Sequence, residues 1–167
     1  MKSDDLVFDM EDIQPLYQSY HMITNTVAIG DFTSSYEPFD VIFNFNYPQN
    51  GATLGKIHTT KTHSEKIIYT IGLLDTTVYN MELLSIFTEL GPYLAKSKGK
   101  RILFHCYAGI SRSSTAAIMY FMMTTCLPLE TIFKMIQSKR SIIDPNPAFR
   151  YILHICNNKR YIRSLVF

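Results

Sequence analysis

The sequence predicts an α/β protein in which a central twisted sheet, mixed or parallel, is flanked by helices. Short apolar runs of strand length alternate with longer stretches whose apolar residues recur at helical spacing. A polar loop at residues 105–114, called the Cys loop below, separates the last short run from a long apolar stretch. Because sites in such sheets form where a strand ends and a helix begins, we expect a functional site in this loop.

Four apolar runs predict strands because they are rich in β-branched and aromatic residues. They cover residues 26–30, 40–45, 66–74 and 101–104. Helices are predicted over residues 81–95, 115–127, 128–138 and 148–161. Pro92 should kink or interrupt the first helix near Gly91. The second is shorter than the roughly 20 residues needed to cross a bilayer, so we interpret it as a core helix and expect no membrane span.

Length and composition predict one compact domain, since 47% of the 167 residues are hydrophobic. We divide it into an N-terminal arm or helix, residues 1–22, and a core, residues 23–163. A net charge of +2, from 16 basic and 14 acidic residues, is too small to favour nucleic-acid binding. The neighbouring cations Lys139 and Arg140 are interpreted as a solvated helix end.

The N-terminal residues 4–12 combine acidic and apolar side chains, which predicts a short helix or a docking arm. Such a segment could pack on its own domain, form a homodimer or bind a partner. The chain start lacks the pattern of a signal peptide. An odd number of cysteines without metal-ligand spacing favours a reducing compartment, and hence an intracellular location, cytoplasmic or nuclear. Cys126 and Cys156 are expected in the core, with a resolving thiol for oxidised Cys106 as the alternative.

The Cys loop combines a nucleophile with an anion cradle. Cys106 and Arg112 are separated by five residues and lie at a predicted helix N-terminus, which favours both a thiolate and a bound dianion. Gly109 permits backbone angles that let successive N–H groups face the anion. Arg112 can clamp two phosphate oxygens, and the Ser113 hydroxyl can ease departure of the thiolate. The anion-binding set is Tyr107, Ala108, Gly109, Ile110, Ser111 and Arg112, and the chemistry requires neither a metal nor a cofactor.

Cleavage of a phosphate ester also requires a proton for the leaving oxygen. Asp75 is the best candidate, because it follows a predicted strand and opens a polar loop at the same edge of the sheet. The alternative is that Asp75 caps the next helix. Asp144 is the rival acid. His105 precedes Cys106 on a strand, so its side chain should point to the opposite face and hold the loop by hydrogen bonds.

The run His-Cys-Tyr-Ala-Gly-Ile-Ser-Arg-Ser resembles the signature of the cysteine-dependent protein tyrosine phosphatases, and in particular their small dual-specificity branch. The resemblance implies that Cys106 is the nucleophile, that Arg112 and the backbone of residues 107–112 bind phosphate, and that Asp75 is the general acid. It extends to residues 27–30 and 41–44, and to 144–149, which resemble the Pro-Asn-x-x-Phe element that contains Asn146.

The sequence departs from the family pattern at three positions, none in the catalytic set. Asp144 stands where Ser is usual, Ile152 stands where Gln is common, and Pro92 interrupts a helix that is usually continuous. His105 and Asn146 are expected to have supporting roles.

The variable residues of the Cys loop carry no charge, whereas related phosphoinositide phosphatases tend to place basic residues there. The resemblance therefore implies a phosphorylated protein as substrate, with phosphotyrosine and phosphoserine or phosphothreonine hydrolysed through a phosphocysteine intermediate. Two alternatives remain open. The same chemistry could act on RNA 5′-phosphates or a phospholipid, or the chain could be a phosphate-binding module without turnover.

Overall fold

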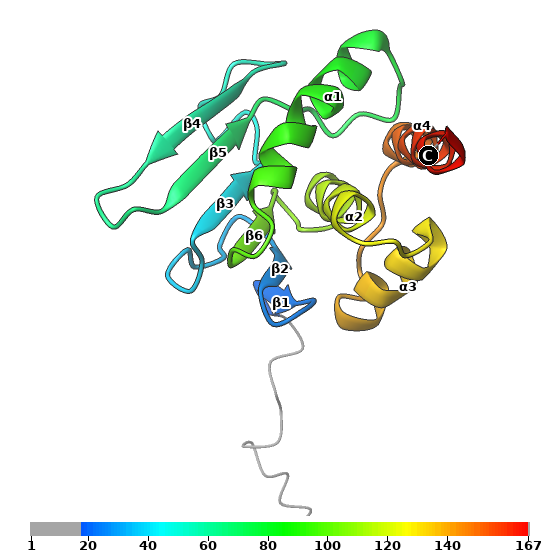
Figure 1. The fold of residues 1–167 in the computed structure, drawn as a ribbon. Helices are drawn as coiled ribbons and strands as arrows, with labels where there is room; N and C mark the ends of the chain where they lie inside the picture. The colour runs from blue at the N-terminus through cyan, green and yellow to red at the C-terminus, as the bar shows by residue number, and fades with distance from the viewer. Residues whose placement is uncertain (1–17, 167) are drawn as a thin grey trace, which may run out of the picture.

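The structure, a computed structural model, describes residues 18–166 and the side chains of residues 18–160, so the predicted segment 4–12 lies outside the described residues. A six-stranded sheet is packed against helices (Figure 1). The strands are β1 Tyr20–Met22, β2 Val27–Gly30, β3 Val41–Asn44, β4 Ile57–Lys61, β5 Ile67–Ile71 and β6 Ile102–His105. The helices are α1 Met81–Lys96, α2 Arg112–Thr124, α3 Leu129–Lys139 and α4 Pro147–Val166.

The sheet has the order β1-β2-β6-β3-β5-β4, and its four inner strands are parallel. Strand β6 lies between β2 and β3, and His105 at its end is in register with both Gly30 and Asn44. The carboxyl ends of three strands therefore meet where the Cys loop begins. The predicted α/β class and the central position of this loop are confirmed.

The two edge strands, β1 and β4, were not predicted. Both are antiparallel to their neighbours, and β4 is exposed along most of its length. Hydrogen bonds to β2 and β5 hold these strands, so their sequences need no alternation of apolar residues. Residues 20–22, the last three of the predicted N-terminal arm, form β1 and pair with β2.

Helix α1 runs without interruption through Pro92, so the predicted interruption is wrong. The Pro92 ring is exposed, while Leu90 and Leu94 on either side are buried in the core. Burial of this apolar face outweighs the loss of one backbone hydrogen bond at the proline.

Helix α2 begins at Arg112, earlier than the predicted residue 115, and nearly all of it is buried. Hydroxyl groups allow its polar first turn to be buried, because Ser114 Oγ and Thr115 Oγ1 donate to the Ser111 carbonyl at 3.0 and 2.8 Å. Within residues 18–166, no helix combines the length and apolarity needed to span a membrane.

Alternating residues of each inner strand contribute to two apolar clusters on opposite faces of the sheet. Val27, Phe43 and Phe104 pack into the larger cluster with the helices. Ile42 and Leu103 pack with Phe39, from the segment after β2, in a smaller cluster that contains no helical residue among those described. The Cys loop thus leaves a strand that is buried on both faces, which gives it a rigid base.

Candidate active site

The Cys loop spans the end of β6 and the first turn of α2. Cys106 follows β6 directly and is only 3% exposed. Ser111 occupies the N-cap position of α2, but its side chain makes no capping hydrogen bond. The N–H groups of the first helical turn are therefore not occupied by the cap side chain, as an anion site at a helix N-terminus requires.

The Ser113 hydroxyl lies against the Cys106 sulfur, with 3.2 Å between Oγ and Sγ. Ser113 is fully buried at the start of α2, so its hydroxyl has a fixed position. This geometry brings together the two residues that the sequence analysis paired. It would allow the hydroxyl to donate a hydrogen bond to a thiolate.

The Arg112 guanidinium is anchored by two segments that lie far from it in the sequence. Its Nη1 donates to the carbonyl oxygens of Tyr47 at 3.0 Å and Leu73 at 3.1 Å. Its Nε is buried and has no hydrogen-bond partner in the described part of the chain. Buried donors are normally paired, so this donor is available to an acceptor such as a phosphate oxygen.

Arg140 is a site residue that the sequence analysis missed. It is 1% exposed, which contradicts its interpretation as part of a solvated helix end. Nε donates to Gly109 O at 2.9 Å and Nη2 to Ala108 O at 3.2 Å. In a trans peptide the N–H points opposite to the C=O, so the N–H groups of Gly109 and Ile110 point away from Arg140. Arg140 thus orients two donors of the anion cradle.

Neighbouring groups partly offset the cost of burying the charged Arg140 guanidinium. Burial lowers the pKa of its guanidinium, while the charges of Asp31 and Cys106 oppose that shift. Nη1 donates to Gln18 O at 3.3 Å and lies 2.8 Å from His21 Nδ1. Burial, followed by the Arg140 charge, lowers the pKa of His21, which favours the neutral ring that can accept this hydrogen bond.

A signal for Arg140 was present in the sequence. Ile132 and Ile136 are the buried residues of α3, and position 140 continues their spacing of four on the same face. Because Lys139 next to it is exposed, the two cations were interpreted together as a solvated helix end, and this periodicity was overlooked.

Gly109 is required at its position for two reasons. Its φ angle of +67° is in the left-handed region. A Cβ atom there would lie 2.6 Å from both Arg140 Nη2 and Gly30 O. The close approach of Arg140 to the loop therefore depends on this glycine.

Asn146 connects the Asp75 segment to the Cys loop. Its Nδ2 donates to Asp75 Oδ1 at 2.8 Å, and its backbone N–H donates to Ser111 Oγ at 3.0 Å. Its Oδ1 accepts from Phe149 N at 3.0 Å, which caps α4. Leu73, two residues before Asp75, also binds Arg112 through its carbonyl. Asp75 is exposed and is thus connected to the site by two routes.

The two candidate carboxylates differ in their hydrogen-bond partners. Asp75 does not cap α1, because Asn80 Oδ1 accepts from Leu83 N at 2.8 Å. The Asp144 carboxylate accepts from Arg150 Nη2 at 2.7 Å, and its backbone N–H donates to Ile110 O.

His105 is buried, and its Nε2 lies 2.6 Å from Tyr36 Oη. Burial lowers the pKa of this imidazole to about 4. The ring is therefore neutral at neutral pH, which makes it a poor acid. The expected hydrogen bond exists, but its partner is Tyr36 in the segment after β2 rather than a residue of the Cys loop.

The two remaining cysteines are distant from Cys106. Cys126 is exposed rather than in the core. It lies beyond the far end of α2, about 20 Å along the helix axis, whereas a disulfide requires Cα atoms within about 7 Å. Cys156 is half-buried and lines a cavity with Met122 and Met123, near that same end. Neither is placed to resolve an oxidised Cys106. Among the side chains described, those of residues 18–160, no His, Cys, Asp and Glu side chains gather as a metal-ligand set.

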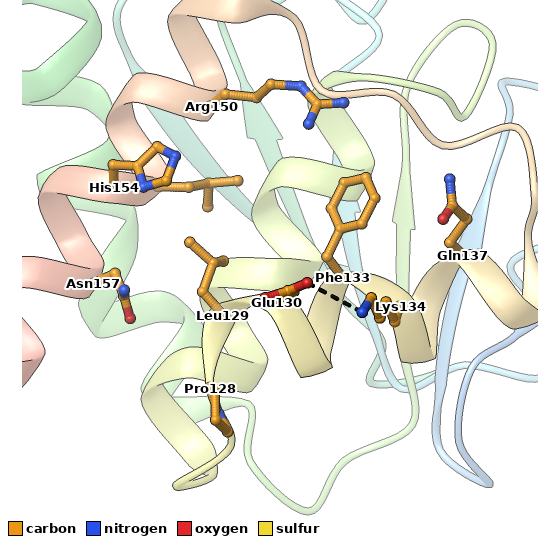
Figure 2. A pocket seen from close by; sticks show the side chains of 10 residues that line it. Pro128, Leu129, Glu130, Phe133, Lys134, Gln137, Arg150, His154 and Asn157 are labelled. Carbon is orange, nitrogen blue, oxygen red and sulfur yellow. Dashed lines mark ion pairs between the residues drawn. The ribbon is translucent and has the colours of Figure 1, made fainter.

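A cavity of about 600 Å³ lies between α3 and α4 (Figure 2). Its lining includes Leu129, Phe133 and His154, and Glu130 and Lys134 form an ion pair across one turn of α3. No residue of the Cys loop lines it. The cavity is therefore separate from the chemistry described above.

Comparison with known proteins identifies the same region. The family model for the dual specificity phosphatase catalytic domain matches residues 29–159. Dual specificity protein phosphatase 1-A of Xenopus laevis is 37% identical over 73 residues, which are 42% of this chain and 20% of that protein. Human dual specificity protein phosphatase 1 is 44% identical over 54 residues, or 32% of this chain and 15% of that protein. The alignments thus span a fifth or less of these relatives.

Solved structures share the fold at low sequence identity. The crystal structure of human DUSP28 aligns with a TM-score of 0.68 at 17% identity, covering 87% of this chain and 97% of that chain. The structure of PTPMT1 in complex with PI(5)P aligns with a TM-score of 0.68 at 20% identity, covering 88% and 99%. At these identities the alignments establish the architecture alone.

Proposed function

Because the chain belongs to the dual specificity phosphatase family, we propose that it hydrolyses phosphotyrosine and phosphoserine or phosphothreonine in phosphorylated proteins. One observation carries the proposal. The Ser113 hydroxyl contacts the Cys106 sulfur at the N-terminus of α2, and Arg112, the first residue of that helix, has a buried Nε without a partner among the described residues. Arg140 holds the carbonyls of that loop on the opposite side, so backbone N–H groups are available to bind phosphate.

In the first step, the Cys106 thiolate attacks phosphorus. The S–P bond forms while the P–O ester bond breaks, and Asp75 donates its proton to the departing oxygen. Arg112 and the backbone N–H groups stabilise the negative charge on the equatorial oxygens of the transition state. The products of this step are the dephosphorylated residue and a phosphocysteine.

In the second step, water attacks the phosphocysteine. The Asp75 carboxylate accepts a proton from the water as the new P–O bond forms and the S–P bond breaks. Ser113 donates a hydrogen bond to the sulfur, which stabilises the thiolate as it leaves. Inorganic phosphate is released and Asp75 is protonated again for the next cycle.

Asp75 is favoured over Asp144 as the general acid because of what each carboxylate binds. The Asp144 carboxylate is engaged in a salt bridge with Arg150, with 2.7 Å between Oδ1 and Nη2. Among the described residues no salt bridge engages Asp75, and Asn146 holds it beside the Cys loop.

The Asp75→Asn substitution tests this role. For a phosphate ester with a poor leaving group, we expect kcat to fall by roughly 10²- to 10⁴-fold, because the leaving oxygen then departs without a proton. For an activated aryl ester the loss should be much smaller. Asp144→Asn is the matched control and should change neither rate strongly. Equal losses on both esters in the Asp75 variant would contradict the assignment.

A phosphate-release assay with four substrates tests the proposed function. Phosphotyrosine and phosphothreonine peptides should be hydrolysed, whereas triphosphorylated RNA and a phosphoinositide should not. Exclusive release from RNA or lipid would overturn the substrate class. Cys106→Ser should abolish turnover, while Cys126→Ser, at an exposed cysteine far from the site, should retain it.

The same assay distinguishes an enzyme from a binding module. If the wild-type protein bound phosphopeptides but released no phosphate from any of the four substrates, the chain would be a phosphate-binding module without turnover. Acid quenching during turnover should trap phosphorus on Cys106, which mass spectrometry can locate.

A further inference from the structure

Two large aromatic side chains are exposed at the edge of the Cys loop. Phe32 is 53% exposed and Tyr107, the residue after Cys106, is 57% exposed. Their rings are stacked almost in parallel, with centroids 5.1 Å apart and planes inclined by 7°. Exposed apolar surface beside a site is characteristic of a surface that contacts a ligand.

The backbone beneath this pair is fixed to the Cys loop. Phe32 N donates to Tyr107 O at 3.1 Å, and Cys106 N donates to Gly30 O at 3.4 Å. The turn that carries Phe32 is held by Asp31, whose Oδ1 accepts from Thr33 N at 2.8 Å. The two rings therefore have a defined position next to the nucleophile.

We propose that Phe32 and Tyr107 form an aromatic platform that contacts the ring of phosphotyrosine and makes this chain prefer phosphotyrosine over phosphothreonine. The proposal rests on the proposed phosphatase function and names a preference within it. Tyr107 directly follows Cys106, and the exposed Phe32 ring stacks on it, so the platform lies at the edge of the proposed phosphate site, within reach of the substrate group that the phosphate is bonded to. A phosphotyrosine ring offers a face or an edge for aromatic packing, whereas phosphothreonine offers only a methyl-bearing carbon.

The opposite side of the site also presents apolar surface. Leu74 is 48% exposed and lies between Leu73, which binds Arg112, and Asp75. A planar aromatic substituent can thus contact apolar groups on two sides. The variable Cys-loop residues Tyr107, Ala108 and Ile110 carry no charge. An uncharged aromatic ring can therefore contact them without burying a charged side chain.

Phe32 is suited to a test because its ring stacks on the Tyr107 side chain, whereas the proposed phosphate ligands at residue 107 and beyond are backbone N–H groups. Phe32→Ala should lower kcat/KM for a phosphotyrosine peptide by about 3- to 10-fold, as expected for loss of one aromatic contact. A phosphothreonine peptide with the same flanking residues should change by less than about 2-fold. Phe32→Leu, which retains apolar volume without a ring, should lie between. Met123→Ala, at another exposed apolar side chain, is the control and should change neither.

A binding measurement separates failure of this inference from failure of the proposed function. In the Cys106→Ser background, calorimetry should show tighter binding of the phosphotyrosine peptide, with the difference reduced about 3- to 10-fold by Phe32→Ala. If the wild-type protein hydrolysed no peptide but this binding preference were present and Phe32-dependent, the proposed function would fail while the platform would stand. Equal effects of Phe32→Ala on both peptides, or no effect, would overturn the platform.

Discussion

The His105 imidazole is buried against Tyr36 on the face of the sheet opposite the larger core cluster. Its burial lowers its pKa to about 4, compared with 6.5 for an unperturbed histidine. An unfolded chain therefore binds a proton at this residue over a pH range in which the folded protein does not. Protonation thus favours unfolding between these two pKa values.

The consequence is a measurable loss of stability on acidification. As pH falls from about 7 to about 4, the free energy of unfolding should decrease by up to about 3 kcal/mol because of His105 alone. Urea unfolding at a series of pH values measures this. His105→Gln should remove that part of the pH dependence, whereas His63→Gln, at an exposed histidine, should not. If the free energy of unfolding depended on pH in the same way in wild type and His105→Gln, His105 would not be the cause of the pH dependence.

Arg140 acts on the site through the Cys loop backbone. Arg140→Met should lower kcat/KM by roughly 10- to 100-fold, because misplaced N–H donors no longer fit the phosphoryl group. Affinity for vanadate, a competitive phosphate analogue, should fall in parallel because it uses the same donors. Lys139→Met is the matched control at the exposed neighbour. A folded Arg140→Met protein with wild-type vanadate affinity would exclude this positioning role.

At the scale of elements, α1 shows how packing overrides a local conflict. Pro92 cannot donate a backbone hydrogen bond to the Thr88 carbonyl, yet the helix continues because its buried face packs against α2. The proline is therefore an unfavourable residue in a helix that tertiary contacts maintain.

Replacing that proline should stabilise the protein. Pro92→Ala restores the missing donor and removes an exposed ring, so the free energy of unfolding should rise by about 1 to 3 kcal/mol. Glu89→Ala, one turn earlier on the exposed face, should stay within about 0.5 kcal/mol of wild type. Chemical unfolding of wild type and the two variants measures these free energies. An unchanged or lower free energy of unfolding for Pro92→Ala would show that Pro92 does not destabilise α1.

At the scale of the whole molecule, segments that are remote in the sequence assemble the site. Arg112 is held by carbonyls that follow β3 and β5, and Asn146 joins the loop after β5 to the Cys loop. Parallel strands make this possible, because their carboxyl ends share one edge of the sheet. The segments that carry Asp75 and Cys106 are thus connected by a residue at the start of α4.

Two substitutions of Asn146 separate its roles. Asn146→Ser retains a capping oxygen for α4 but cannot reach Asp75, so kcat for a poor leaving group should fall about 10-fold with little change in stability. Asn146→Ala should also lose the cap, which costs about 1 kcal/mol of unfolding free energy. Steady-state rates and thermal unfolding of both proteins test this. A wild-type kcat for Asn146→Ser would show that the link to Asp75 has no catalytic role.

Local patterns were sufficient to predict the inner strands and the Cys loop. Strands β2, β3 and β6 are almost entirely apolar because both of their faces are buried, and a strand buried on both faces must be apolar along most of its length. Strand β5 is half-buried and also mostly apolar. Cys106, Gly109, Arg112 and Ser113 lie within a few residues of one another. Their spacing along the chain therefore already places them in one strand–loop–helix segment.

The sequence by itself thus determined the α/β class, the central loop and its thiol chemistry. Only the tertiary structure decided that Arg140 supports the loop, that Asn146 connects Asp75 to it, that β1 and β4 complete the sheet, and that Phe32 stacks on Tyr107. Each of these joins segments far apart in the chain, through single hydrogen bonds or ring contacts that leave no periodic pattern. Such contacts become visible only when the fold brings the segments together.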